Sequence, residues 1–256
     1  MPSSSAEPRL LPVPSAALLP TSSSAYWSFY DRVSTAQLAA WDLPAGSLVL
    51  ELSGGSFHHA AQLAEAGHRV LQVDSQINLG EPTCAPGVQR LLAAHDELTW
   101  LRDASVDAIL VESQVLSRCL ATEFTVEHLV RALRPGGRLL LIVDSLLLGL
   151  ARLADQGRWA ELADVPAADC VLVSAEDGTL RRCFGPQALR ELLVDAGLEV
   201  DWVRPRSVLS VSAVERALAA EGPTALPTLV RTELALAQEH EGESAGHYLV
   251  ASARRP

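Results

Sequence analysis

Several features that would mark this chain of 256 residues as disulfide-rich, metal-binding, secreted or membrane-spanning are missing from it. Its four cysteines, Cys84, Cys119, Cys170 and Cys183, show no C-x-x-C spacing, which indicates reduced thiols and neither a zinc site nor a disulfide framework. No uncharged apolar run reaches the roughly 18 residues that a membrane span needs. The N-terminus also lacks the basic start and apolar core of a secretion signal. We therefore expect a cytoplasmic protein without a metal site.

Positive charge is also scarce. The 31 Asp and Glu residues outnumber the 20 Lys and Arg residues, which gives a formal net charge of -11 and a pI near 5.1. A chain this acidic is a poor candidate for binding nucleic acid or an anionic membrane surface. Its hydrophobic content of 48% is enough for one substantial α/β core. The oligomeric state is not indicated by these numbers.

The stretch from Leu48 to Asp74 alternates strand-like and helix-like patterns. In order, it contains an apolar strand (48–50), an acid (Glu51), a turn of small residues (53–56), a helical apolar pattern (57–64), a glycine stop (Gly67), a second apolar strand (70–73) and a second acid (Asp74). That order predicts one βαβ unit, which requires a right-handed parallel crossover.

The chemistry of such a unit favours a nucleotide-like ligand. Gly54 and Gly55 let the backbone approach a ligand closely, and the next helix offers free N–H groups at its start. Asp74, about 20 residues beyond the turn, can accept hydrogen bonds from both hydroxyls of a ribose. A nicotinamide dinucleotide fits less well, because Ser53 and His58 occupy glycine positions of its G-x-G-x-x-G pattern. A turn that is only a tight connection would leave the two acids unexplained.

These residues resemble the cofactor-binding segment of class I S-adenosylmethionine-dependent methyltransferases. In that family an acid ends the first strand, a G-x-G-x-G turn follows, and another acid ends the second strand. Glu51 and Asp74 match the two acids and Gly55 the middle glycine, whereas Ser53 and Phe57 replace the other two. The resemblance implies an α/β fold with a Rossmann-like doubly wound sheet, mostly parallel with an antiparallel last strand, and S-adenosyl-L-methionine as cofactor.

Three later segments extend the resemblance. Residues 133–137 form an L-x-P-G-G segment between a helical pattern and an apolar strand at 138–143, an order typical of the family. Asp96 matches the family's acid that receives the adenine amino group, although it could instead cap the next helix. Glu112 follows the predicted fourth strand, whose end borders the methyl group and the acceptor in the family, but it could equally be a solvated edge acid. The cofactor-binding residues implied on the sheet are Glu51, Ser53, Gly54, Gly55, Asp74, Ser75, Asp96 and Glu112.

Aromatic residues make up only 5% of the chain, yet Tyr26, Trp27, Phe29 and Tyr30 fall within one short segment. They predict a helix before the first strand, which in the family often covers the cofactor. An aromatic ring facing a sulfonium is worth about 0.5–2 kcal/mol, and we predict such contacts for Tyr26 and Tyr30. Packing of the helix onto the domain is the alternative, and it suits Trp27 and Phe29 at least as well.

The catalytic residues are not identified by the sequence. Methyl transfer mainly needs alignment of the reacting atoms, and a base helps only where the acceptor is a hydroxyl or an amine. His58, His59, His95 and Tyr30 are possible bases, and His59 and Tyr30 are the candidates we retain. A neutral histidine at a helix start could accept a proton, although capping or packing explains such a residue as well.

The predicted organisation is a disordered tail over residues 1–24 and one methyltransferase-like domain over 25–256, with insertions at about 144–183 and 205–246. The first insertion contains a hairpin signal with Asp177 and Gly178 at its turn, and we expect it to lie over the active-site side and to help select the acceptor. The predicted function is methyl transfer from S-adenosyl-L-methionine to a small-molecule acceptor. Because two of the three turn glycines are replaced, a protein that binds this cofactor for other chemistry or for regulation is the alternative.

Overall fold

The computed structural model describes residues 24–53, 59–75, 85–95, 98–112, 114–165, 168–175 and 178–256. Its strands are β1 (Leu48–Leu52), β2 (Arg69–Asp74), β3 (Val88–Leu92), β4 (Val106–Val111), β5 (Leu133–Asp144), β6 (Cys170–Ser174), β7 (Leu180–Phe184), β8 (Glu199–Arg206) and β9 (Tyr248–Arg254). Its helices are α1 (Ser24–Ala39), α2 (His59–Glu65), α3 (Val115–Arg118), α4 (Thr122–Ala132), α5 (Leu146–Asp155), α6 (Trp159–Asp164), α7 (Pro186–Asp195), α8 (Val211–Glu221) and α9 (Leu226–Glu239), with a 3-10 turn at Gly222–Ala225.

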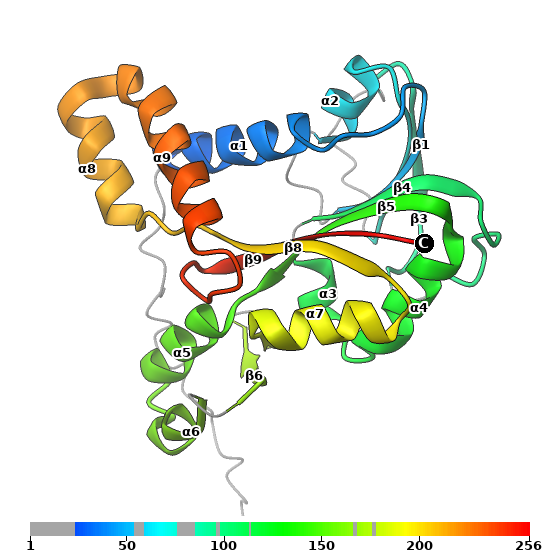
Figure 1. The fold of residues 1–256 in the computed structure, drawn as a ribbon. Coiled ribbons are helices and arrows are strands. Elements are labelled where there is room, and N and C mark those ends of the chain that lie inside the picture. Colours follow the sequence, from blue (N-terminus) through cyan, green and yellow to red (C-terminus); the bar gives the residue numbers. More distant parts are fainter. Residues whose placement is uncertain are drawn as a thin grey trace, which may run out of the picture.

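A seven-stranded sheet organises the described residues, in the order β3-β2-β1-β4-β5-β9-β8 (Figure 1). The first five strands of this order pair in parallel, whereas β9 runs antiparallel to both β5 and β8. The predicted α/β fold with an antiparallel last strand is therefore confirmed. In the pairing register, Leu52 lies opposite Val73 of β2 and Val111 of β4, so the C-terminal ends of these three strands form one continuous edge.

Helices cover both faces of the sheet and enclose two apolar cores (Figure 1). On one face α3, α4 and α7 pack on side chains such as Leu50 and Ile109. On the other face α1, α2, α8 and α9 pack on side chains such as Val49 and Leu110. Strands buried on both faces need the nearly continuous apolar sequences that β1 and β4 have. No helix among the described residues combines the length and the apolar character of a membrane span.

Glycine and proline residues stand at the ends of helices, and the helix end predicted at Gly67 is confirmed. Gly67 and Gly197 have φ angles of 91° and 89° just after α2 and α7, a left-handed conformation that glycine adopts without the cost of a Cβ. Pro186 stands in the first turn of α7, where its missing N–H costs no hydrogen bond. The fifth strand differs from the prediction, because β5 already begins at Leu133 and so includes the L-x-P-G-G segment.

The segment after β5 contains α5, α6 and the predicted hairpin. Its strands β6 and β7 pair antiparallel, with Cys170 opposite Phe184. A parallel bridge between Ser145 and Phe184 ties the hairpin to the end of β5, so this segment starts from the carboxyl edge of the sheet. Several predicted features lie outside the described residues: the tail over 1–23, the turn residues 54–56, Asp96 and the hairpin residue Asp177.

Gly246 holds β8 and β9 close together at this edge. Its carbonyl accepts a 2.5 Å hydrogen bond from the Ser145 hydroxyl, and a Cβ on Gly246 would overlap the backbone of Arg206. Backbone cannot move aside as a flexible side chain can, so glycine is required here.

We expect Gly246→Ala to lower the free energy of unfolding by about 3 kcal/mol, because it overpacks a buried backbone contact. Gly242→Ala is the matched control, since Gly242 has a φ of 82° but open space around it. That control should cost only about 1 kcal/mol, from the left-handed backbone. Urea unfolding of the two variants checks the ranking, and equal losses would contradict this account of Gly246.

Candidate functional site

Three acidic side chains meet at the carboxyl edge of the sheet. Side chains alternate between the faces of a strand, so Glu51 lies on the same face as Val49, and Glu112, just after β4, on the same face as Leu110. Asp74 ends β2, the neighbour of β1 on the other side. All three acids are buried. The carboxyl ends of parallel strands are where ligands of open α/β sheets bind.

Glu51 is the central acid of the three and has no compensating partner. Its side chain is 0% exposed, and no described residue forms a hydrogen bond with either carboxyl oxygen. Burial, reinforced by the nearby charges of Glu112 and Asp74, raises the pKa of Glu51 to about 8. A buried polar group without a partner is rare and calls for an explanation. A cation placed against Glu51 would supply the missing partner.

Asp74 is held by residues of its own and neighbouring strands. One carboxyl oxygen accepts a hydrogen bond from Arg90 Nη2 of β3 at 2.9 Å, and the other accepts from the Ser53 hydroxyl at 3.4 Å. Ser53 is buried directly after β1, and it also accepts a hydrogen bond from Gln72 at 3.4 Å. Ser75, the residue after Asp74, is exposed. Arg90 therefore balances the charge of Asp74 while the carboxylate remains at the edge of the sheet.

Glu112 is the acid on the other side of Glu51, and it belongs to a buried polar network. Its Oε1 accepts hydrogen bonds from Arg206 Nη1 and from the Ser34 hydroxyl, each at 3.4 Å, and lies 3.7 Å from His59 Nε2. Its Oε2 is buried without a partner. The network joins the end of β4 to α1, to the start of α2 and to the end of β8.

Arg206 is the centre of this network and is only 1% exposed. Its Nε donates to Gln37 Oε1 at 2.7 Å, and its Nη1 donates to the Tyr30 hydroxyl at 3.3 Å and to Ser34 Oγ at 3.2 Å. The two outer acids, Asp74 and Glu112, thus each face an arginine, and the central acid faces none.

Neither arginine was predicted from the sequence to belong to the site. Arg206 is the last residue of β8. A charged residue at the end of an apolar strand was the one signal that could have pointed to it. Ser34, Gln37 and Arg90 gave no such signal, because polar residues on a helix or an edge strand are common.

The two tyrosines proposed to contact the cofactor are buried, at 3% and 2% exposure. The Tyr26 hydroxyl donates to Ser207 at 3.1 Å, and the Tyr30 hydroxyl accepts from Arg206. Burial raises the pKa of both phenols, which makes Tyr30 a poor base near neutral pH. Their contact with a cofactor stays a prediction.

The histidines differ in their surroundings. His59 is the first residue of α2 and is 2% exposed, with Nε2 3.0 Å from Ser34 Oγ and beside Glu112. The His95 ring lies 3.1 Å from the carbonyl oxygen of Val73. Of the two described candidate histidines, His59 is therefore the one in the network at the edge. Gly54, Gly55, Asp96 and His58 lie outside the described residues, and no group of three or more metal-ligating side chains is found in the described part of the chain.

No protein-family model matches the chain, and no curated protein matches its sequence. Solved structures do match. An S-adenosylmethionine-dependent methyltransferase from Mesorhizobium loti has a TM-score of 0.56 at 16% identity and covers 87% of this chain and 98% of its own. The 1,6-didemethyltoxoflavin-N1-methyltransferase of Burkholderia thailandensis, solved with 1,6-didemethyltoxoflavin and S-adenosylhomocysteine, has a TM-score of 0.52 at 20% identity, covering 90% and 80%. The chain therefore has the fold of class I S-adenosylmethionine-dependent methyltransferases.

Proposed function

We propose that this protein binds S-adenosyl-L-methionine at the carboxyl edge of its sheet and transfers the methyl group to a small-molecule acceptor. The fold supports the proposal, and so does the place of the three acids on it. The single observation that carries it is the carboxyl group of Glu51, which is buried, central and unpartnered.

The charges at the edge fit this cofactor. The cofactor carries an ammonium group and a sulfonium, and an ammonium donates hydrogen bonds that a carboxylate accepts strongly. Glu51 would bind the ammonium, and its raised pKa would then fall as it ionises against the cation. Asp74 would accept from the ribose hydroxyls, with Arg90 and Ser53 holding the carboxylate in place. Gly54 and Gly55 would let the backbone approach, and Asp96 would receive the adenine amino group.

The chain itself has little chemistry to perform. The cofactor supplies a methyl group that is already bonded to a positively charged sulfur, so the protein has to align the acceptor with it. For a hydroxyl or amine acceptor, His59 is placed to take up the proton that the acceptor loses. Ser34 and Glu112 would orient its ring, since both lie close to Nε2. Arg206 would hold the Glu112 side chain in position.

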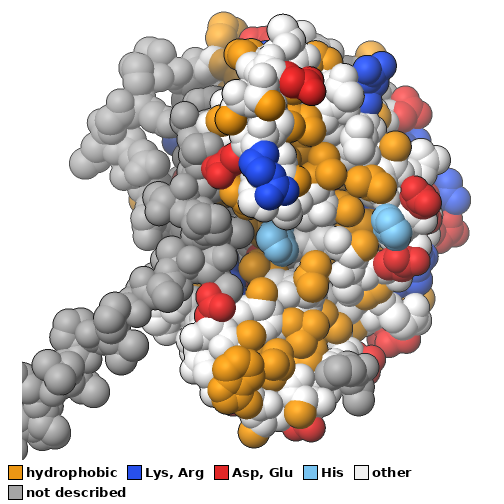
Figure 2. Space-filling view, turned by 90° about the vertical axis from the view of Figure 1, so that its left-hand side faces the viewer, with side chains coloured by type: hydrophobic (Ala, Val, Ile, Leu, Met, Phe, Trp, Pro, Cys, Tyr) orange, Lys and Arg blue, Asp and Glu red, His pale blue; other side chains and the backbone are white. Residues whose placement is uncertain are grey.

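The segment between β5 and α7 supports an apolar acceptor. It starts from the carboxyl edge, and it exposes large hydrophobic side chains: Leu147 at 38%, Trp159 at 64%, Leu172 at 50% and Leu180 at 44%. Figure 2 shows hydrophobic side chains over the lower part of the face that carries α5 and α6. A surface of this kind favours a small molecule with an apolar body over a charged macromolecule.

The proposal is tested first by calorimetry with S-adenosyl-L-methionine and S-adenosylhomocysteine, then by mass spectrometry of S-adenosylhomocysteine formed with a panel of small apolar alcohols and amines. We expect binding of both compounds and product formation with some acceptors. Glu51→Gln should bind S-adenosyl-L-methionine at least about tenfold more weakly, because a neutral amide loses a charge-assisted hydrogen bond. Absence of binding would remove the proposal, and binding without product would favour a cofactor-binding regulator.

Glu51→Gln should also change how the stability of the free protein depends on pH. The folded carboxyl group keeps its proton up to a pKa of about 8, against 4.5 ordinarily. The unfolded chain therefore binds fewer protons between these values, and stability falls as the pH rises through that window. Glutamine does not ionise, so the variant should match the wild type near pH 5 and exceed it above pH 8, by about 4 kcal/mol. Thermal unfolding across this range measures the difference. If the stabilities of the variant and the wild type differed by the same amount at every pH, the assignment would be contradicted. Glu161→Gln, which replaces an exposed acid, should not change how stability depends on pH.

Asp74→Asn tests the ribose assignment. We expect it to weaken binding of S-adenosylhomocysteine by about 1.5–3 kcal/mol, the scale of a hydrogen bond to a charged group. The matched control is Asp103→Asn, which breaks an exposed Arg131 pair on the surface and should leave the affinity unchanged. Calorimetry on both variants decides the point, since an unaltered affinity in Asp74→Asn would show that this acid does not hold the ribose.

A further inference from the structure

A cavity lies on the same face of the sheet as the three acids but away from them. Its volume is about 410 Å³, and its walls come from the C-terminal half of α1, from α9 and from β5, β8 and β9. The sheet residues that line it, such as Leu140 and Trp202, precede the strand ends at the carboxyl edge. A volume of this size holds a small organic molecule. Nothing in the proposed methyl transfer uses it.

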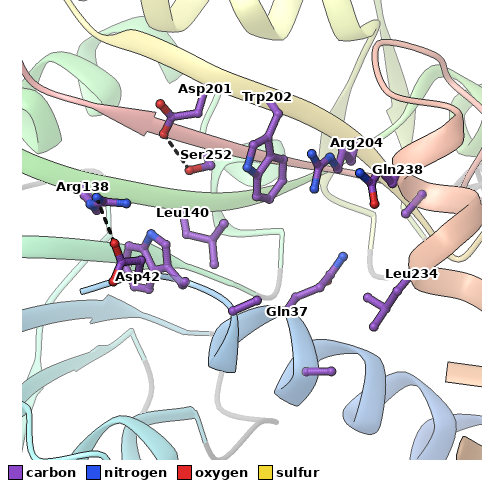
Figure 3. A pocket seen from close by; sticks show the side chains of 14 residues that line it. Gln37, Asp42, Arg138, Leu140, Asp201, Trp202, Arg204, Leu234, Gln238 and Ser252 are labelled. Carbon is purple, nitrogen blue, oxygen red and sulfur yellow. Dashed lines mark hydrogen bonds and ion pairs between the residues drawn. The ribbon is translucent and has the colours of Figure 1, made fainter. Parts of the chain in front are cut away.

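The cavity offers aromatic and apolar walls. The Trp202 side chain reaches from β8 toward α1, with Leu140 behind it and Leu234 of α9 at one side (Figure 3). The Arg204 guanidinium carbon lies 4.6 Å from the centre of the Trp202 ring, and this contact limits the freedom of the ring. A planar ring held in this way is a surface on which another flat ring can stack.

The cavity wall contains side chains that can donate hydrogen bonds to a ligand. Trp41 lines it, and its buried indole N–H has no hydrogen-bond partner in the described part of the chain. The amide oxygen of Gln37 is already used by Arg206, so this side chain has N–H groups left to offer. Of the two acids in the wall, Asp201 accepts from Ser252 at 3.1 Å, and Asp42 pairs with an arginine.

Arg138 is the available cation of the two arginines in the wall. Among the described residues its charge partner is Asp42, at the loose distance of 3.6 Å, and the Asp42 side chain is 90% exposed. Arg204, by contrast, donates to Glu241 at 2.9 Å and covers Trp202. In Figure 3 the Arg138–Asp42 pair and Arg204 stand toward opposite ends, with Trp202 between them. An exposed ion pair of this length is worth little, so an anion can compete for Arg138.

We propose that this cavity is a binding site for a small aromatic carboxylate. The carboxylate accepts hydrogen bonds from the Arg138 guanidinium and from the unpartnered Trp41 N–H, and the aromatic ring lies against Trp202 over the apolar wall of α1. This assignment satisfies the buried indole donor, uses the cation with the weakest partner and fills a space of the right size. It does not depend on the proposed methyl transfer, because none of the three acids takes part.

The test uses indole-3-carboxylate as the probe and its isosteric amide, indole-3-carboxamide, as the neutral counterpart. The chain has five tryptophans, and their indole N–H signals are observed by NMR in protein labelled with nitrogen-15, in which the probe itself is silent. Trp41→Phe identifies the Trp41 signal. We expect indole-3-carboxylate to shift that signal in a saturable way, and the carboxamide to bind at least about tenfold more weakly, as the loss of a charge-assisted contact implies.

Two arginine variants complete the experiment. Arg138→Gln should lower the affinity for indole-3-carboxylate at least about tenfold. Arg158→Gln should leave it unchanged, because Arg158 lies just before α6 and pairs with Glu161 outside the cavity. The other indole signals report whether each variant stays folded. The proposal is overturned if the Trp41 signal does not move, if the carboxamide binds as tightly as the acid, or if Arg138→Gln binds like the wild type.

Discussion

The charge arrangement at the carboxyl edge depends on the buried carboxyl group of Glu51. Its carboxyl group lies at the end of a strand in the middle of the sheet, where strands on both sides and helices on both faces exclude water. No described residue donates to it. Removing a carboxylate from water costs far more than a single apolar contact returns, so the group keeps its proton to higher pH than usual. An acid in this state is poised to receive a cation.

The residues on either side of Glu51 add to the preference of this edge for a cation. Arg90 balances Asp74 from one side of the sheet, and Arg206 balances Glu112 from the other. Each arginine comes from an outlying strand, β3 or β8, and reaches toward the centre. If a third arginine faced Glu51, the edge would have no reason to bind a positively charged ligand. The distribution of charge, more than the glycine turn, supports the proposed cofactor.

The Arg206 network also connects the carboxyl edge with the cavity beside α1. Arg206 contacts Glu112 at the carboxyl edge and Gln37 in the wall of that cavity. Helix α1 supplies Gln37, Ser34 and Tyr30 to this one guanidinium. The helix is therefore held to the sheet by polar contacts as well as by the packing of its aromatic residues. Because these contacts are buried, losing any one of them leaves an unpaired group in a dry environment.

Local sequence patterns were sufficient to predict the strands, their order of occurrence and the acids at their ends, because apolar periodicity and glycine or proline stops act over a few residues. Glu51, Asp74 and Glu112 could be predicted together for the same reason, since each ends a parallel strand. The sequence could not reveal that Arg90, Arg206, Ser34 and Gln37 complete the site, or that Trp41 and Arg138 border a cavity. These residues are far apart in the chain, and only the pairing of β8 with β9 and the docking of α1 bring them together. Charge compensation across a sheet is a long-range property, and the tertiary structure alone decides it.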